Sequence, residues 1–247
     1  MRHSSLLKSA FPISLLLLIW QALSTFINTA VLPSPLMVLN TLILAIKSGE
    51  LLYHLGFTLY RLCLSFFIAM VLGISIGLLL GRSEKVNQFF NSWLIIFLNI
   101  PALVSTILCY VWFGLIETAA IFAIVINKLP NVIVTIREGA KNIDEELVEM
   151  ATVYQLGYFK TLQHVILPQL FPYIMAAART GLALIWKIVL VVELLGRSNG
   201  MGYQIHLFFQ LFDISSILAY TVSFIIIIHF IEIAILQPLD KTAKQWK

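Results

Sequence analysis

The sequence predicts an all-α polytopic membrane protein, and three observations support this class. The 247 residues are 60% hydrophobic and only 11% charged, with a mean hydropathy of +0.95, which does not fit a soluble globular domain. The chain contains about six apolar runs long enough to cross a bilayer. Its Lys and Arg residues gather in alternate connections between these runs. Because backbone polar groups in lipid must be paired internally, we expect the runs to be helices.

The six predicted spans follow one another along the whole chain. The first has basic flanks and no small-residue cleavage site, so it is predicted to be retained as a helix. After it, a Pro-Ser-Pro turn leads into apolar residues at helical spacing, which predict a helix along the outer face of the membrane: Leu36, Leu39, Ile43 and Ile46. The spans cover about residues 11–31, 55–81, 90–112, 116–136, 169–195 and 215–236.

Glycine and proline residues mark three of these spans. In the second, Gly73, Gly77 and Gly81 share one helix face and would let a neighbouring backbone approach closely. The third and fourth contain Pro101 and Pro130, and proline bends a helix because it frees a carbonyl group. We therefore expect a kink in each, serving either packing geometry or the lining of a pathway.

The basic residues predict the orientation of the chain. They precede the first span, separate the second from the third and the fourth from the fifth, and follow the last: Arg2, Lys8, Arg82, Lys85, Arg137, Lys141, Lys160, Lys241, Lys244 and Lys247. The other connections carry mainly Lys47 and Arg197. Positive charge favours the cytoplasmic side, so both termini and the long central connection are predicted to be cytoplasmic. This distribution explains the net charge of +4 without a nucleic-acid partner.

The central connection, about residues 138–168, is longer than a simple link between helices. Asp144 is a favourable N-cap, and Glu145 and Glu146 suit the first turn of a helix. The sequence predicts a turn after this helix, in which Gly157 is able to adopt a positive φ. An apolar stripe recurs at helical spacing, opposite Glu145, Glu149 and Thr152; it consists of Leu147, Met150, Ala151 and Tyr154.

Such an amphipathic helix needs a surface to pack against. One alternative is that it lies on lipid head groups, but a lipid-bound helix favours Lys and Arg on its polar face. The polar face here is acidic. The pattern therefore favours docking to another protein.

The stretch "EMATVYQLGYFKTLQHVILP" resembles the EAA loop of ABC importer permeases. Further segments, "LPSP", "LGISIGLLLGRS", "NIPAL", "VWFGLIETAAIF" and "NGMGYQI", are similar to the nitrate, sulfonate and taurine branch of that family, so the resemblance covers about residues 32–240. The matching loop positions are Glu149, Met150 and Ala151 for E-A-A, Val165 for the Ile, and Leu167 and Pro168 for the final Leu-Pro.

One loop position departs from the family pattern. The loop glycine of the family falls at Gln155, whereas this chain offers Gly157 two residues later. We therefore expect the turn to be shifted or reshaped.

The resemblance implies the transmembrane architecture of a type I ABC importer, in one permease domain covering residues 1–247. It implies a bacterial inner-membrane protein that pairs with a second permease chain, most simply an identical one. It also implies a periplasmic or surface solute-binding protein, and a pair of cytoplasmic ATP-binding subunits that receive the loop helices. The residues it places at that contact are Glu149, Met150, Ala151, Tyr154, Gln155, Gly157, Leu167 and Pro168.

The chain is not expected to be an enzyme. It lacks a G-x-x-x-x-G-K-S/T phosphate loop, so ATP and Mg would be held by the partner subunit, and no cofactor is expected in this chain. Its five His and two Cys residues are scattered without ligand spacing, so no metal site is predicted. A secondary transporter or channel is the alternative function, but no carboxylate cluster for a coupling ion is evident in the spans.

Charged residues within the spans are candidates for the translocation path. Lys187 is predicted either to line the path and favour an anionic solute or to form a structural ion pair. Glu193 is predicted to be a gate or an interhelical hydrogen-bond residue. Arg61 and Lys128 are predicted to extend toward the membrane interface. The solute itself is left open among alkanesulfonates, taurine, nitrate and pyrimidine precursors of thiamine.

Overall fold

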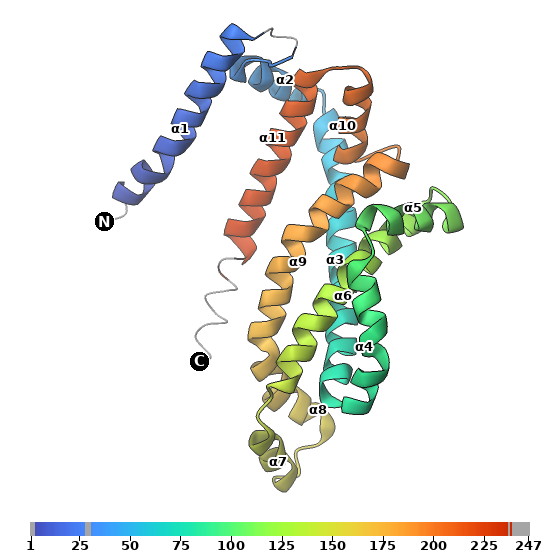
Figure 1. Ribbon diagram of the computed structural model, residues 1–247. Coiled ribbons are helices and arrows are strands. Elements are labelled where there is room, and N and C mark those ends of the chain that lie inside the picture. The colour runs from blue at the N-terminus through green and yellow to red at the C-terminus, as the bar shows by residue number, and fades with distance from the viewer. Residues whose placement is uncertain (1–2, 28–30, 237, 239–247) are drawn as a thin grey trace.

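The computed structural model describes residues 3–27, 31–236 and 238, and its regular elements within these ranges are all helical (Figure 1). Two π-helical turns, Leu162–Ile166 and Glu232–Leu236, continue into or out of α-helices. The α-helices are α1 His3–Phe26, α2 Pro35–Lys47, α3 Glu50–Arg82, α4 Glu84–Asn99, α5 Ala102–Phe113, α6 Glu117–Lys141, α7 Glu145–Val153, α8 Tyr158–Thr161, α9 Leu167–Gly196, α10 Met201–Gln210 and α11 Ile214–Ile231.

Within the described residues, most of each predicted span is helical, but the described helices that could each cross a membrane are fewer than six. Four are long and apolar enough: Glu50–Arg82, Glu117–Lys141, Tyr158–Gly196 and Ile214–Ala234. The pair α4 and α5 would make a fifth, although it is bent by 97°. In α1, the segment Ser14–Phe26 is a shorter apolar helix, about 20 Å long at 1.5 Å per residue. The hydrocarbon layer is about 30 Å thick.

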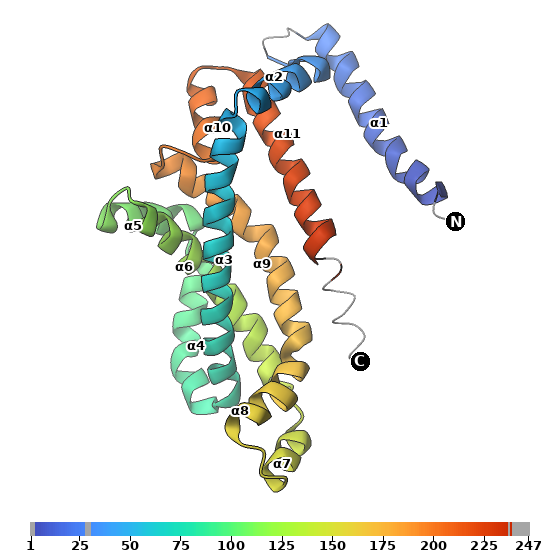
Figure 2. The ribbon, with the colours of Figure 1, turned by 180° about the vertical axis from the view of Figure 1, so that it is seen from behind.

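The prolines act differently in the two helices predicted to kink. Pro101 lies at the break between α4 and α5, where the 97° bend confirms the first kink. As a result, α5 projects sideways from the bundle (Figures 1 and 2). Pro130 lies inside α6, which remains helical from Glu117 to Lys141.

Helices α3, α6 and α9 form the centre of the bundle (Figures 1 and 2). The predicted glycine face of α3 packs against α6. A Cβ atom at Gly77 would lie 2.7 Å from the Cβ atom of Ile136, and one at Gly73 or Gly81 would collide with α6 side chains. The close approach predicted from the glycine spacing is therefore confirmed.

The two ends of the bundle differ in the elements that they carry. Helices α7 and α8, the α3–α4 turn and the C-terminal end of α6 lie at one end, here called the α7 end (Figure 1). Helix α2 and the α10–α11 turn lie at the other, the α2 end. The α7 end carries the basic residues of two connections, as predicted, including Arg82, Lys85 and Lys141. The terminal residues used in the orientation prediction, Arg2, Lys241, Lys244 and Lys247, lie outside the described residues.

The helix predicted between the first two spans is confirmed as α2. The Ser34 side chain accepts a hydrogen bond from the Met37 backbone N–H, and Pro35 occupies the first turn, where no intrahelical donor is required. Helix α2 packs on α11 and crosses the α2 end of the bundle (Figure 1). Trp20 of α1 donates a hydrogen bond to the Pro33 carbonyl (3.0 Å), which links α1 to the start of α2.

Candidate functional site

Helix α7 is held to the bundle at its N-terminal end. The Asp144 side chain accepts a hydrogen bond from the Glu146 backbone N–H (2.9 Å), which confirms the predicted N-cap. The Asp144 backbone N–H donates to the Gln169 side chain of α9 (2.8 Å). Arg82, at the end of α3, forms an ion pair with Glu145 (2.5 Å). The start of α7 is thus connected to both α3 and α9.

The predicted apolar stripe of α7 faces a pocket of about 330 Å³ between α7 and the chain that leads into α9. Ala151 is only 2% exposed, so the middle of the stripe packs against the protein itself. The pocket is lined by the four stripe residues Leu147, Met150, Ala151 and Tyr154, together with Leu156, His164, Val165, Pro168 and Gln169. Of the predicted contact residues, Glu149, Gln155, Gly157 and Leu167 do not line it.

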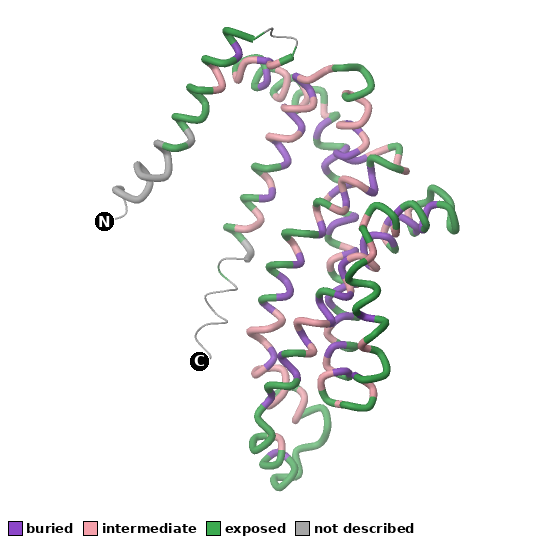
Figure 3. The backbone as a smooth tube through the Cα atoms, viewed as in Figure 1, coloured by how far each residue is buried: buried purple, intermediate pink, exposed green. Residues whose placement is uncertain are grey.

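The tip of this segment consists of exposed residues (Figure 3), and several of them are large and apolar. Val153 is 80% exposed and Tyr154 74%, and they are followed by Tyr158 at 74% and Phe159 at 81%. The Tyr158 and Phe159 rings pack edge to face, 5.8 Å apart. These two aromatics are not among the predicted contact residues, although their position beside a turn in a polar connection was a usable signal. We call Val153, Tyr154, Tyr158 and Phe159 the apolar tip.

The turn after α7 reverses at Gln155 and not at Gly157. Gln155 has φ +54°, whereas Gly157 has φ −57°, so the turn does not use the positive φ that Gly157 could adopt and is not shifted to that residue. The Gln155 N–H donates to the Thr152 carbonyl (3.0 Å) and the Leu156 N–H to the Ala151 carbonyl (2.9 Å). These two bonds form a Schellman motif, which places the residue after the helix cap in the left-handed region. Gln155 therefore occupies the conformation that glycine would adopt at this place.

Replacing Gln155 with glycine is expected to stabilise this turn. The left-handed conformation costs a residue with a Cβ atom about 1 kcal/mol or more, and glycine avoids most of that cost. Hydrogen exchange of the Leu156 amide should slow by about fivefold in Gln155→Gly and accelerate in Gln155→Val. Faster exchange in the glycine variant would show that the turn is not strained.

At the α2 end of α3, Arg61 lies at the centre of a buried ion-pair cluster. Its side chain is 0% exposed, and it pairs with Glu117 of α6 (2.6 Å) and Glu193 of α9 (2.7 Å). It also donates to the backbone carbonyl (2.9 Å) and the side-chain oxygen of Asn199, in the α9–α10 connection. The prediction that Arg61 extends to the membrane interface is wrong, because carboxylates from two other helices hold it inside the bundle.

Glu193 is completely buried, and its carboxylate makes three contacts. One oxygen pairs with Arg61, and the other accepts hydrogen bonds from the Thr58 hydroxyl (2.9 Å) and the Gly202 backbone N–H (2.9 Å). Gly200, with φ +112°, lies so close that a Cβ atom there would collide with the Glu193 carboxylate. Glu193 thus joins α3, α9 and α10, in agreement with an interhelical hydrogen-bonding role.

Lys128 is also buried, contrary to its predicted extension toward the interface. It is 1% exposed, and among the described residues its ammonium group has no hydrogen-bond partner. Its Cε atom lies 2.8 Å from where a Cβ atom of Gly181 would be. The absence of a side chain at Gly181 therefore makes room for Lys128 between α6 and α9.

Lys187, the candidate path residue, lies on an exposed part of α9. Within the described ranges no carboxylate forms an ion pair with it.

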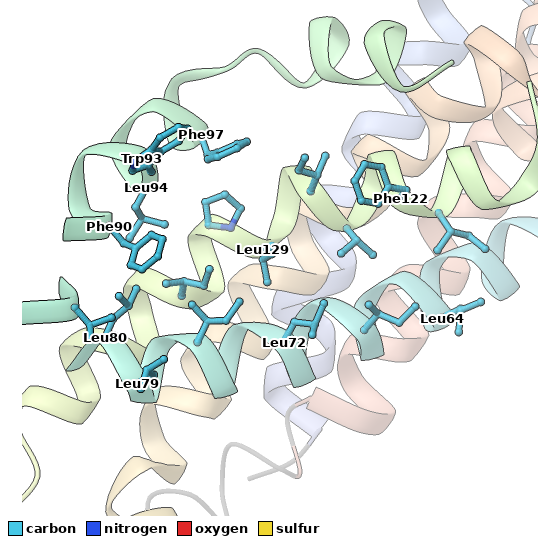
Figure 4. A pocket seen from close by; sticks show the side chains of 18 of the residues that line it. Leu64, Leu72, Leu79, Leu80, Phe90, Trp93, Leu94, Phe97, Phe122 and Leu129 are labelled. Carbon is cyan, nitrogen blue, oxygen red and sulfur yellow. The ribbon is translucent and has the colours of Figure 1, made fainter. Parts of the chain in front are cut away.

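A larger groove of about 830 Å³ runs along α3, α4 and α6 (Figure 4). Aromatic residues such as Phe90 and Trp93 line one side, and Leu72 and Leu129 another. Among the described lining residues, polar side-chain groups are limited to the Thr118 hydroxyl and the Trp93 indole N–H. Such an apolar surface suits hydrocarbon and offers almost no polar group to an anion.

Comparison with known proteins agrees with this architecture. Residues 69–236, more than half of the chain, match the family described as "Binding-protein-dependent transport system inner membrane component". The chain is 32% identical over 194 residues to a putative aliphatic sulfonates transport permease protein, SsuC, of Bacillus subtilis, covering 78% of this chain and 70% of that protein. It is 27% identical over 221 residues to the taurine transport system permease protein TauC of Escherichia coli, covering 82% and 80%.

The fold is also similar to that of a solved transporter. A chain of the MetNI methionine ABC transporter, in an inward-facing conformation, matches with a TM-score of 0.69 and 18% identity, covering 81% of this chain and 98% of that one. This likeness confirms the predicted all-α, type I importer architecture. Together with the family match over residues 69–236, it shows that the chain belongs to the binding-protein-dependent inner-membrane components, the permease subunits of ABC importers.

Proposed function

We propose that this permease imports a small anion and is driven by a cytoplasmic ATPase that docks on the apolar tip and the pocket behind it. The observation that carries this proposal is the exposure of Tyr158 and Phe159, at 74% and 81%, on a segment fixed to two bundle helices. Exposed aromatic side chains beside a pocket are typical of the central residues of protein interfaces. The pocket of about 330 Å³ offers a place for an apolar side chain of the ATPase.

The attachments of α7 provide the route by which the ATPase would act on the membrane helices. A displacement of α7 acts on α3 through the Arg82–Glu145 ion pair and on α9 through the Asp144–Gln169 hydrogen bond. ATP binding and hydrolysis then favour different permease conformations because the ATPase holds α7 differently in each state. The predicted residues Glu149, Met150, Ala151, Tyr154 and Gln155, with Gly157, Leu167 and Pro168, belong to this coupling segment, about residues 138–168.

The remaining partners follow from the same proposal. ATP and Mg would be bound by the ATPase pair, and a solute-binding protein would deliver the solute at the α2 end. Two identical permease chains would form the path, with the α7 end and both termini in the cytoplasm. The basic residues at the α7 end support this orientation.

A sulfonate, taurine or nitrate is the solute class that we propose. Taurine and aliphatic sulfonates are named for the relatives described above. Lys187 supports an anion, because it is an exposed cation on a membrane helix without an ion-pair partner in the described part of its own chain.

Uptake by membrane vesicles tests the function. Vesicles containing this chain together with its ATPase and its solute-binding protein are expected to accumulate labelled taurine, an alkanesulfonate or nitrate only when ATP is supplied. Uptake without the ATPase would instead identify a secondary transporter or channel.

In the double variant Tyr158→Ser/Phe159→Ser, the amount of ATPase that copurifies with the permease is expected to fall about tenfold or more. Central aromatic residues of interfaces contribute about 2 kcal/mol or more to the binding free energy. Phe209→Ser/Leu211→Ser is the matched control, since these side chains are also 62% and 67% exposed but lie at the α2 end. Equal retention by both variants would place the docking surface elsewhere.

A further inference from the structure

At the centre of the ion-pair cluster, the hydrogen bonds of Arg61 exclude direct binding of a solute to its guanidinium group. A guanidinium group has five N–H donors. In Arg61 these are used by two oxygens of Glu117, one of Glu193, and the carbonyl and side-chain oxygens of Asn199. Arg61 thus has no donor left for an anion, and its role must concern the protein itself.

The cluster joins separate parts of the chain with balanced charge. Arg197, after α9, pairs with Glu117 (2.7 Å) and donates to the Leu115 carbonyl (2.7 Å). Two arginines therefore face two glutamates. We call Arg61, Glu117, Glu193, Arg197 and Asn199 the outer clamp.

The surroundings of the outer clamp fix the start of α10 as well. The Met201 backbone N–H donates to the Thr58 hydroxyl of α3 (2.8 Å), and the Gly200 N–H donates to the His54 ring (3.0 Å). Tyr110 of α5 donates to the Val192 carbonyl of α9 (2.8 Å). Helices α3, α5, α6, α9 and α10 are thus tied together near one level of the bundle.

We infer that Arg61 and Glu193 are positioning residues that keep these helix ends together as one unit throughout the transport cycle. If the clamp opened in each cycle, Arg61 and Glu193 would lose their partners inside the bundle, where both side chains are 0% exposed, and that loss is unfavourable. This inference rests on the proposed function in one respect, which is that the transport cycle is driven by ATP.

Distance measurements between spin labels test the inference. The labels are placed at the exposed positions Thr118 of α6 and Gln210 of α10, by Thr118→Cys/Gln210→Cys, after replacement of the native cysteines by Cys63→Ser and Cys109→Ala. Labelled chain is diluted with unlabelled chain, so that the distance is measured within one protomer. The distribution is expected to be narrow and the same without nucleotide and with ATP and vanadate. A distance that changes with nucleotide would overturn the inference.

Substitutions of Glu193 in the same doubly labelled protein test whether the clamp holds the helices in place. Glu193→Gln keeps the shape of the side chain but removes its charge, and it is expected to broaden the distance distribution; Glu193→Asp should restore a narrower one. Glu84→Gln is the matched control, because Glu84 is exposed and hydrogen-bonds only Gln88 among the described contacts. An unchanged distribution in Glu193→Gln would show that the clamp does not position these helices.

A further control separates this inference from the proposed function. The Thr118 label alone, without dilution, measures between two protomers and is expected to respond to nucleotide. If the ATPase does not bind, the proposed function fails. The role of the clamp can still be decided in the permease alone, by comparing the Thr118–Gln210 distance distribution of Glu193→Gln with that of the native protein.

Discussion

Glu193→Ala is expected to prevent most of the permease from folding into a stable protein. The change leaves Arg61, which is 0% exposed, with one of its two carboxylate partners, and leaves the Gly202 N–H without its acceptor. Removing one member of a buried ion pair costs about 3–5 kcal/mol, a large part of the roughly 5–15 kcal/mol that stabilises a folded domain. The yield of monodisperse detergent-solubilised protein and its midpoint of thermal unfolding measure this effect.

The matched substitution is Glu84→Ala, which removes an exposed carboxylate at the α7 end and should change the midpoint by little. Arg61→Lys should fall between native protein and Glu193→Ala, because lysine keeps the charge but has three donors in place of five. A native midpoint in Glu193→Ala would contradict the assignment of Glu193 to a stabilising interhelical cluster.

Ala151→Glu is expected to abolish ATP-dependent uptake. Ala151 is 2% exposed between α7 and the start of α9, so a glutamate there either buries an unpaired charge, at about 3 kcal/mol or more, or forces α7 away from the bundle. Both outcomes remove the connection between the ATPase and the membrane helices. Uptake by vesicles and copurification of the ATPase are the measurements.

Thr152→Glu is a suitable control for this charge, because Thr152 is the next residue of α7 and is exposed. It should leave uptake close to that of native protein. Strong uptake by Ala151→Glu would show that the packing of α7 on its own chain is not needed for coupling.

The helices of this protein could be predicted from the sequence because a bilayer accepts few backbone conformations. The same constraint made the glycine face of α3 informative: Gly73, Gly77 and Gly81 recur at one-turn spacing and do pack on α6. The break at Pro101 followed from the chemistry of proline. These predictions depended on neighbouring residues alone.

The outer clamp depends on residues far apart in the sequence, and for that reason it was not predicted. Arg61 pairs with residues 56 and 132 positions away, Glu117 and Glu193. An isolated arginine near the end of a span gives no indication of such partners. The burial of Lys128 also depends on a residue far away in the sequence, because Gly181 in another helix leaves the space for its side chain.

The turn after α7 shows why residue type alone did not predict which residue has a positive φ. Residue preference assigned the positive φ to Gly157, but the bonds that end α7 impose it on Gln155. The position of the helix end decides the conformation of the following residue, and the sequence predicts helix ends less accurately than helices. The apolar tip was missed in part because Tyr158 and Phe159 lie beyond the turn that ends α7, where the spacing of the α7 stripe no longer applies.

The two groups of ion pairs have unequal exposure, and ionic strength therefore acts on them differently. The Arg82–Glu145 pair at α7 has side chains that are 30% and 67% exposed, whereas Arg61 and Glu193 are both 0% exposed. At a physiological Debye length of about 8 Å, dissolved ions screen the exposed pair strongly and the buried pair much less. Concentrated salt thus weakens the Arg82–Glu145 ion pair between α3 and α7, while the Arg61–Glu193 pair at the opposite end of the bundle stays intact.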